Sequence, residues 1–286
     1  NHTPYLYTVY VEILDKEAGL LEVIPYEVGF RRIEIKDKVM YLNGKRLVLV
    51  GVNRHEWSPK TGRCIGMEEM ISDMACIQRN NINAVRTCHY PDQIPWYYMC
   101  DKEGIYLMSE TNLESHGSFQ KLGAIEPSCN VPASIPQWKE AVVDRARTNF
   151  ETFKNHTSIL FWSLGNESYA GDDIEAMNTF FKENDPGRLV HYEGSYYTRA
   201  YEDTISDMES RMYAKPWEVE EYLSNDPKKP YLLCEFMHDM GNSMGGLGSY
   251  MELLDKYEMY QGGFIWDFID QALYVTDEVT GKEVLR

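Results

Sequence analysis

Short apolar runs alternate with helix-length amphipathic segments from residue 44 onward, and this alternation restricts the possible folds more than any other feature. Eight runs are predicted strands, at residues 47–52, 82–86, 105–109, 159–164, 189–193, 208–213, 231–235 and 263–267. Helices are predicted between them at 68–80, 93–103, 136–154, 173–183, 216–223 and 247–257. Over roughly 240 residues this predicts an α/β fold, the (β/α)8 TIM barrel. The rival doubly wound sheet normally carries a glycine-rich phosphate loop after its first strand, and none is visible.

The first forty residues follow a different pattern. Strand-like runs cover 5–14, 20–24 and 28–35, with a turn at 16–19. Three strands cannot form a stable sandwich, which needs about seven. Residues 1–40 are therefore predicted to be the last strands of an upstream, immunoglobulin-like β-sandwich domain, and 41–286 the TIM barrel domain. No helix follows the eighth strand, so we expect a barrel that is cut short at its C-terminus.

Charge and composition exclude several classes of partner. The sequence has 45 acidic and 28 basic residues, a net charge of −17, which argues against binding to nucleic acid or an anionic membrane. No apolar run reaches the length of a membrane span, and the N-terminus lacks the pattern of a signal peptide. None of the six cysteines forms a C-x-x-C pair. Free thiols in a reducing cytoplasm are therefore expected.

Polar or aromatic residues follow nearly every predicted strand. In a TIM barrel the carboxyl ends of the strands form the active-site rim, so these side chains are expected to converge. In chain order they are Asn53, Arg54, His55, Glu56, Arg86, His89, Glu110, Glu114, His116, Asn166, Glu167, Glu193, Tyr213, Glu235, His238, Trp266 and Asp267. Packing alone does not explain so many polar groups on one rim.

Glu167 and Glu235 end two apolar runs that face each other across the predicted barrel mouth. Two carboxyl groups across one cleft are the minimum for glycoside hydrolysis, one as acid/base and one as nucleophile. A separation of about 5–5.5 Å would mean retention of anomeric configuration, and about 6.5–9.5 Å inversion. Asn166 could bind a sugar 2-hydroxyl, and Tyr213 could donate a hydrogen bond to the nucleophile.

Glu114 and His116 are two residues apart, so in extended chain their side chains point the same way. With a third ligand from a neighbouring loop they could hold a divalent cation. The alternative is a hydrogen-bonded Glu–His pair on the rim. The spacing alone leaves both interpretations open.

Several longer motifs resemble those of glycoside hydrolase family 2, most closely its bacterial members that act on β-galactosides. The resemblance runs nearly from end to end of the sequence. The matching segments are residues 28–31 (VGFR), 51–56 (GVNRHE), 83–86 (NAVR), 89–91 (HYP), 162–168 (WSLGNES), 233–235 (LCE) with His238, 240–243 (MGNS) and 262–267 (GGFIWD).

The resemblance implies a retaining exo-glycosidase that hydrolyses terminal β-D-galactosides through a galactosyl-enzyme intermediate. Glu167 would be the acid/base and Glu235 the nucleophile. Glu114, His116 and Glu167 match the family's Mg²⁺ ligands. The matching substrate-pocket residues are His55, His89, Asn166, Tyr213, His238 and Trp266, with Arg86 near the nucleophile. The resemblance also implies a Na⁺ site that this sequence holds only in part, flanking β domains, and an oligomeric full-length protein in the bacterial cytoplasm.

The sequence departs from the family pattern at two places. Residues 109–112 read Ser-Glu-Thr-Asn where Asp-Glu-Ala-Asn is more frequent, and Trp57-Ser58 replaces a histidine-rich pair. Within the family, β-glucuronidase or β-mannosidase activity is the alternative. A glucuronidase usually carries an Asn-x-Lys motif late in the barrel, and the sequence has none there. A catalytically incomplete sugar-binding fragment is the alternative from another class of protein.

Overall fold

The computed structural model describes residues 4–119, 130–241 and 243–286. Within them, eight parallel strands form one sheet in the order β10-β9-β8-β7-β6-β13-β12-β11. The first barrel strand pairs with the last, as barrel closure requires. The strands are β6 (Leu49–Arg54), β7 (Ala84–Thr87), β8 (Tyr106–Glu110), β9 (Ile159–Ser163), β10 (Leu189–His191), β11 (Glu209–Met212), β12 (Tyr231–Phe236) and β13 (Tyr260–Phe268). The predicted TIM barrel is confirmed.

The six predicted helices are present, with ends shifted by at most a residue or two. They are α1 (Met67–Arg79), α2 (Ile94–Glu103), α4 (Pro136–Phe153), α5 (Asp172–Asn184), α6 (Pro216–Ser224) and α7 (Leu247–Lys256). A proline in the first turn starts α2, α4 and α6, where no backbone donor is lost. Gly104 ends α2 at φ 73°, a conformation that glycine adopts without strain. A one-turn helix, α3 (His116–Phe119), was not predicted.

The interval between β10 and β11 differs from the rest of the barrel. In the described part of the chain, these two strands share no backbone ladder, and two short 3₁₀ turns, η1 (Gly194–Tyr196) and η2 (Arg199–Tyr201), replace a helix between them. A side-chain hydrogen bond of 2.8 Å between His191 Nε2 and Ser210 Oγ bridges the seam. Leu189 and Met208 pack in the same buried cluster. Side chains, together with a backbone hydrogen bond from the Asp207 N–H to the Val190 carbonyl, therefore close the barrel on this side.

A three-stranded meander seals the end of the barrel opposite the carboxyl ends of its strands. It consists of β3 (Ile33–Lys36), β4 (Val39–Leu42) and β5 (Lys45–Arg46). Met40 is fully buried, and its backbone N–H donates to Gln261 of β13. The run predicted at 28–35 is thus divided. Val28 ends the preceding hairpin, whereas Ile33–Lys36 form β3, in which Ile33 is buried. The domain boundary at residue 40 stays a prediction.

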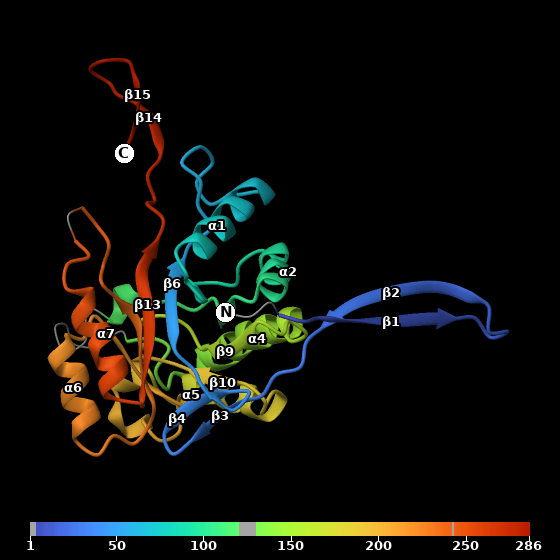
Figure 1. The fold of residues 1–286 in the computed structure, drawn as a ribbon, viewed down its shortest axis with the longest axis horizontal. Helices are drawn as coiled ribbons and strands as arrows, with labels where there is room; N and C mark the ends of the chain where they lie inside the picture. The colour runs from blue at the N-terminus through green and yellow to red at the C-terminus, as the bar shows by residue number, and fades with distance from the viewer. Residues whose placement is uncertain (1–3, 120–129, 242) are drawn as a thin grey trace.

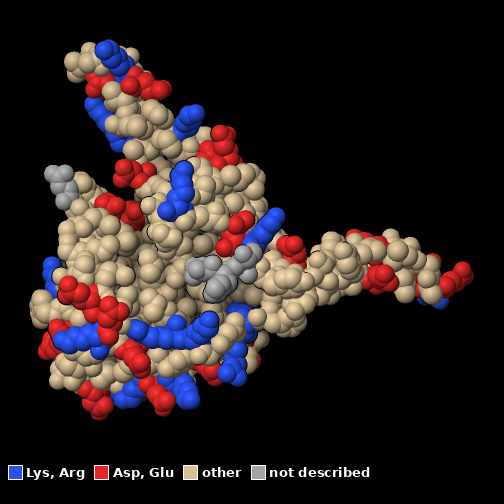
Figure 2. Space-filling view, viewed as in Figure 1, with Lys and Arg blue, Asp and Glu red and all other residues tan. Residues whose placement is uncertain are grey.

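Two hairpins extend from the barrel (Figure 1). The longer one pairs β1 (Tyr7–Leu14) with β2 (Leu20–Val28), and every residue of β1 is exposed. Uncharged side chains cover most of its visible face (Figure 2). These are the first two predicted strands, and the sandwich to which we assigned them stays a prediction. The second hairpin, β14 (Tyr274–Thr276) with β15 (Glu283–Leu285), was not predicted. None of the described helices combines the length and the hydropathy needed to cross a bilayer.

Candidate active site

Glu235 lies in β12 near the carboxyl end of the strand, where it is almost fully buried. Arg86 Nη1 donates to its Oε1 at 2.8 Å, and the hydroxyl of Tyr213 donates to its Oε2 at 2.8 Å. Both carboxyl oxygens are therefore held, one by a donor from β7 and the other by the residue that follows β11. A carboxylate held in this way has one fixed orientation towards the cleft.

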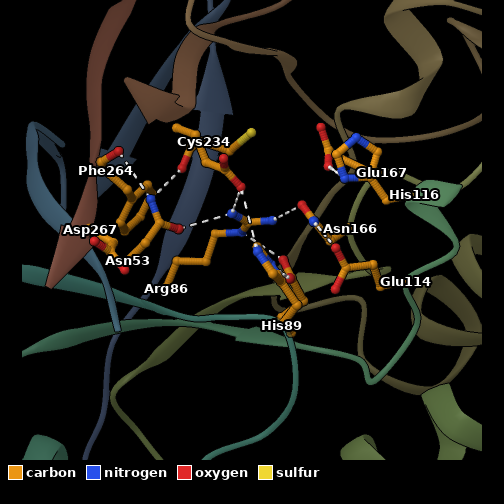
Figure 3. Close-up of polar contacts among 12 residues, drawn as sticks. Asn53, Arg86, His89, Glu114, His116, Asn166, Glu167, Cys234, Phe264 and Asp267 are labelled. Atoms are coloured by element: carbon orange, nitrogen blue, oxygen red, sulfur yellow. Dashed lines mark hydrogen bonds and ion pairs between the residues drawn. The ribbon is translucent and has the colours of Figure 1, made fainter. Parts of the chain in front are cut away.

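Arg86, in β7, connects the groups around this carboxylate (Figure 3). Its guanidinium also donates to Asn53 Oδ1 and Asn166 Oδ1, each at 2.9 Å, and to Glu110 Oε2 at 2.6 Å. Burial opposes its charge, but Glu110 and Glu235 raise the pKa of Arg86 well above its usual value. Because the planar guanidinium has donors in a fixed geometry, it sets the relative positions of four side chains.

Glu110, the last residue of β8, orients His89 as well as Arg86. Its Oε1 lies 2.7 Å from His89 Nδ1. Burial lowers the pKa of His89 to about 3, so the imidazole is neutral near pH 7. A neutral ring that donates from Nδ1 to Glu110 presents Nε2 as an acceptor, and this atom lies 3.8 Å from Glu235 Oε1. The sequence placed Glu110 on the rim but assigned it no role.

An aromatic wall forms where Trp266 of β13 meets two histidines. The Trp266 ring stacks on His89 with centroids 5.2 Å apart, and His55 meets it edge-on at 5.6 Å. Burial lowers the pKa of His55 to about 3. A half-buried indole flanked by neutral imidazoles suits the apolar C–H face of a sugar. The ring of His238 lies 5.9 Å from that of Tyr213, which brings His238 to the same rim.

Glu167 follows β9, directly after Asn166. His116 Nδ1 lies 2.6 Å from Glu167 Oε2. Burial raises the pKa of the Glu167 carboxyl; His116 opposes this effect, whereas the negative charges of Glu235 and Glu114 add to it. A carboxyl group that keeps its proton to higher pH is suited to general acid catalysis.

A cavity of about 550 Å³ opens beside the rim, lined in part by His55, His89 and Glu114. This volume falls within the range of small-molecule sites. Trp138 and Arg145 of α4 line its outer side. The cleft therefore extends from the aromatic wall towards the loop that carries Glu114.

Glu114, His116 and Glu167 are brought together, with one ligand atom from each lying within 4.8 Å of the others. Asn166 Nδ2 donates to Glu114 Oε1 at 3.1 Å and orients that carboxylate. Two carboxylates and one imidazole form a donor set that fits a divalent cation such as Mg²⁺. The described contacts therefore agree with the predicted ligand set, whose occupancy stays a prediction.

Glu193 is a buried carboxyl group behind the acid/base candidate. Its Oε1 accepts the backbone N–H of Glu167 at 2.8 Å. Burial raises the pKa of Glu193 to about 8. The sequence analysis placed Glu193 on the rim but gave it no role. Its partner is a backbone N–H from another loop, and such a contact leaves no pattern in the sequence. A carboxylate just after a buried strand was the only signal.

Two residues covered by the sequence analysis cannot be placed in the structure. Asn242 of the motif at 240–243, and Cys129, lie outside the described residues. The other five cysteines are free thiols, as expected.

Comparison with known proteins identifies the class of this barrel. Residues 33–286 match the family described as glycosyl hydrolases family 2, TIM barrel domain. The chain therefore belongs to glycosyl hydrolase family 2, as the motifs predicted.

Three relatives with similar sequences come from bacteria. The chain is 67% identical to the β-galactosidase large subunit of Lactobacillus helveticus, with all of this chain and 46% of the relative covered. It is 63% identical to the large subunit from Lactobacillus acidophilus, with the same coverage. It is 56% identical to the β-galactosidase of Halalkalibacterium halodurans, with 98% of this chain and 27% of the relative covered. The chain thus spans less than half the length of these relatives.

Among solved structures, β-glucuronidase from Ruminococcus gnavus matches with a TM-score of 0.77. The identity is 21%, and 96% of this chain and 53% of the other are covered. At this identity the likeness shows the shared fold.

Proposed function

We propose that the protein containing this chain is a retaining exo-β-galactosidase, with Glu167 as acid/base and Glu235 as nucleophile. The observation that carries the proposal is the contrast between the two carboxyl groups. Arg86 and Tyr213 hold both oxygens of Glu235, whereas burial raises the pKa of Glu167. One group is arranged to attack and the other to donate a proton.

In the first step, a Glu235 oxygen attacks the anomeric carbon while the bond to the leaving oxygen breaks. Glu167 transfers its proton to that oxygen, and an ester joins the sugar to Glu235. In the second step, Glu167, now a carboxylate, takes a proton from water as the water oxygen attacks the same carbon. Glu235 leaves as a carboxylate, and Arg86 and Tyr213 stabilise its returning charge.

Glu114, His116 and Glu167 would hold Mg²⁺ in this proposal. Bound there, the cation would supply positive charge that favours the carboxylate form of Glu167. Asn166 would orient Glu114 and contact the substrate from the same loop. The Na⁺ site implied by the family resemblance stays a prediction, since no described residue is assigned to it.

The printed names of the relatives support a proposal about assembly. Two of them are large subunits, so we propose that the full-length protein pairs with another subunit or forms an oligomer and uses flanking β domains. A cytoplasmic location in a bacterium is proposed on the same basis. The exposed β1–β2 hairpin is compatible with packing against such a domain.

A covalent trap tests the function. The intact protein is incubated with 2-deoxy-2-fluoro-β-galactosyl fluoride, with the glucuronyl analogue in parallel, and labelled peptides are mapped by mass spectrometry. We expect a galactosyl adduct on Glu235 and no adduct in Glu235→Gln. Labelling by the glucuronyl reagent would favour the alternative of β-glucuronidase activity. No label from either reagent would favour a sugar-binding scaffold.

A further inference from the structure

The backbone of Glu167 has an unusual conformation. Its φ of 37° lies in the left-handed region, where residues with a Cβ are rarely found. Gly165, two residues earlier, has φ 146°, and a Cβ there would meet the carbonyl oxygen of Leu113 at 2.6 Å. The loop that carries the acid/base candidate is therefore tightly packed, and its backbone needs support from its surroundings.

Two sides of the loop are held by different strands. On one side, the N–H of Asn166 donates to the Leu113 carbonyl at 2.8 Å. On the other, two consecutive residues after β10 receive the next two backbone donors. Glu193 Oε1 accepts the N–H of Glu167 at 2.8 Å, and the Tyr192 hydroxyl accepts the N–H of Ser168 at 3.1 Å.

The contact from Glu193 is specific. Glu193 is 2% exposed, and its Oε2 has no hydrogen-bond partner among the described residues. In the described structure, the buried Glu193 carboxyl group makes one side-chain hydrogen bond, and its donor is the backbone N–H of Glu167. Gly194 allows the arrangement, since a Cβ there would meet the Tyr192 ring at 2.4 Å.

We propose that Glu193 is a positioning residue for acid/base catalysis, which holds the backbone of Glu167 so that its carboxyl faces the leaving oxygen. The inference rests on the proposed function and deepens it. In this proposal Glu193 acts through the Glu167 N–H and not directly on the substrate. Without this acceptor, the Glu167 N–H would lose its partner and the left-handed backbone would lose one of the hydrogen bonds that support it.

The test compares leaving groups in the intact protein. Phenyl β-galactoside needs a proton from Glu167, whereas 2,4-dinitrophenyl β-galactoside has a leaving group that departs without one. We expect Glu193→Leu to lower kcat/KM about 100-fold for the phenyl substrate and less than about fivefold for the dinitrophenyl substrate. Glu193→Gln keeps an oxygen acceptor and should stay within about threefold of wild type on both.

Asp101→Leu is the matched control. Asp101 is also buried and accepts a backbone N–H, from Ser158 at 2.7 Å, at the start of β9. Any loss in this variant should be the same for both substrates. If Glu193→Leu does not fold, Glu193→Asp, which withdraws the acceptor by one methylene, should show the same preference for the activated substrate.

Two results would overturn the inference. One is an equal loss on both substrates in folded Glu193→Leu or Glu193→Asp, and the other is a Glu193→Gln variant as impaired as Glu193→Leu. The trap with the fluorinated sugar is run on the same samples. If wild type is labelled at Glu235 but the variants lose equal activity on both substrates, this inference alone is overturned. Wild type that cleaves neither substrate defeats the proposed function as well.

Discussion

The hydroxyl of Tyr213 donates to Glu235 Oε2 at 2.8 Å, across the junction between β11 and β12. Arg86 occupies the other oxygen, so the carboxylate has one cationic and one neutral donor. Burial and the charge of Glu235 raise the pKa of Tyr213, which keeps its proton on the hydroxyl. The phenol is therefore a permanent donor to the proposed nucleophile.

Removing this donor should slow the step in which Glu235 leaves. We expect Tyr213→Phe to lower kcat roughly 10- to 100-fold, since a hydrogen bond to a charged group contributes about 1.5–3 kcal/mol. The measurement is steady-state kinetics, with mass spectrometry to detect accumulated glycosyl-enzyme. Tyr222→Phe is the control, because that hydroxyl bonds the Lys229 carbonyl on the outer side of the barrel. An unchanged kcat in Tyr213→Phe would contradict the assignment.

Chelation should lower activity if Glu114, His116 and Glu167 hold a cation. Added Mg²⁺ should restore the activity of wild type, and Glu114→Gln should need about tenfold more because one charged ligand is lost. Titration calorimetry with Mg²⁺ provides a readout independent of turnover. Glu140→Gln, on the exposed face of α4, should bind Mg²⁺ as wild type does. Equal calorimetric binding in Glu114→Gln would rule out this ligand set.

Protonated Glu167 should set the alkaline limb of the rate profile. In the cation-free site its pKa is raised by burial, so there the acid form persists to higher pH than for an ordinary glutamate, and the rate falls as pH rises through that pKa. Glu167→Gln should lack the limb when the substrate has an activated leaving group. The profile of kcat/KM against pH measures this effect. A limb that survives the substitution would assign it to another residue.

Buried His89 should make the fold sensitive to acid. Its folded pKa of about 3 lies below the ordinary value of 6.5, so the unfolded chain binds the proton first as pH falls. This contribution to stability is complete above pH 6.5 and is lost as pH falls towards 3. We expect His89→Gln to reduce the slope of unfolding free energy in that window by up to about 1.4 kcal/mol per pH unit.

Urea unfolding at several pH values measures the slope. The control is His238→Gln, because this imidazole is exposed. If the slope of unfolding free energy against pH is the same in wild type and in His89→Gln, then His89 titrates alike in the folded and the unfolded chain.

The sequence predicted the barrel because each βα unit leaves a local pattern of apolar runs and amphipathic helices. The ends of Ile159–Ser163 and Pro136–Phe153 were within a residue of the prediction for this reason. The meander under the barrel and the β14–β15 hairpin were missed, since short strands there depend on non-local packing and turns. The supporting residues were missed for a related reason. Glu110 and Glu193 act on side chains or backbone from other strands, and a linear sequence does not show those contacts.

The seam between β10 and β11 has a mechanical consequence. Glu167 follows β9, next to one edge of the seam, and Glu235 lies in β12, next to the other. On the long way round the barrel, continuous backbone ladders join the two carboxyl-bearing strands. On the short way, a few separate bonds take the place of a ladder in the described structure, among them those from the Asp207 N–H to the Val190 carbonyl at 2.8 Å and between His191 and Ser210. The barrel thus has one interrupted junction, which lies between the two catalytic candidates, and its width is set mostly by side chains.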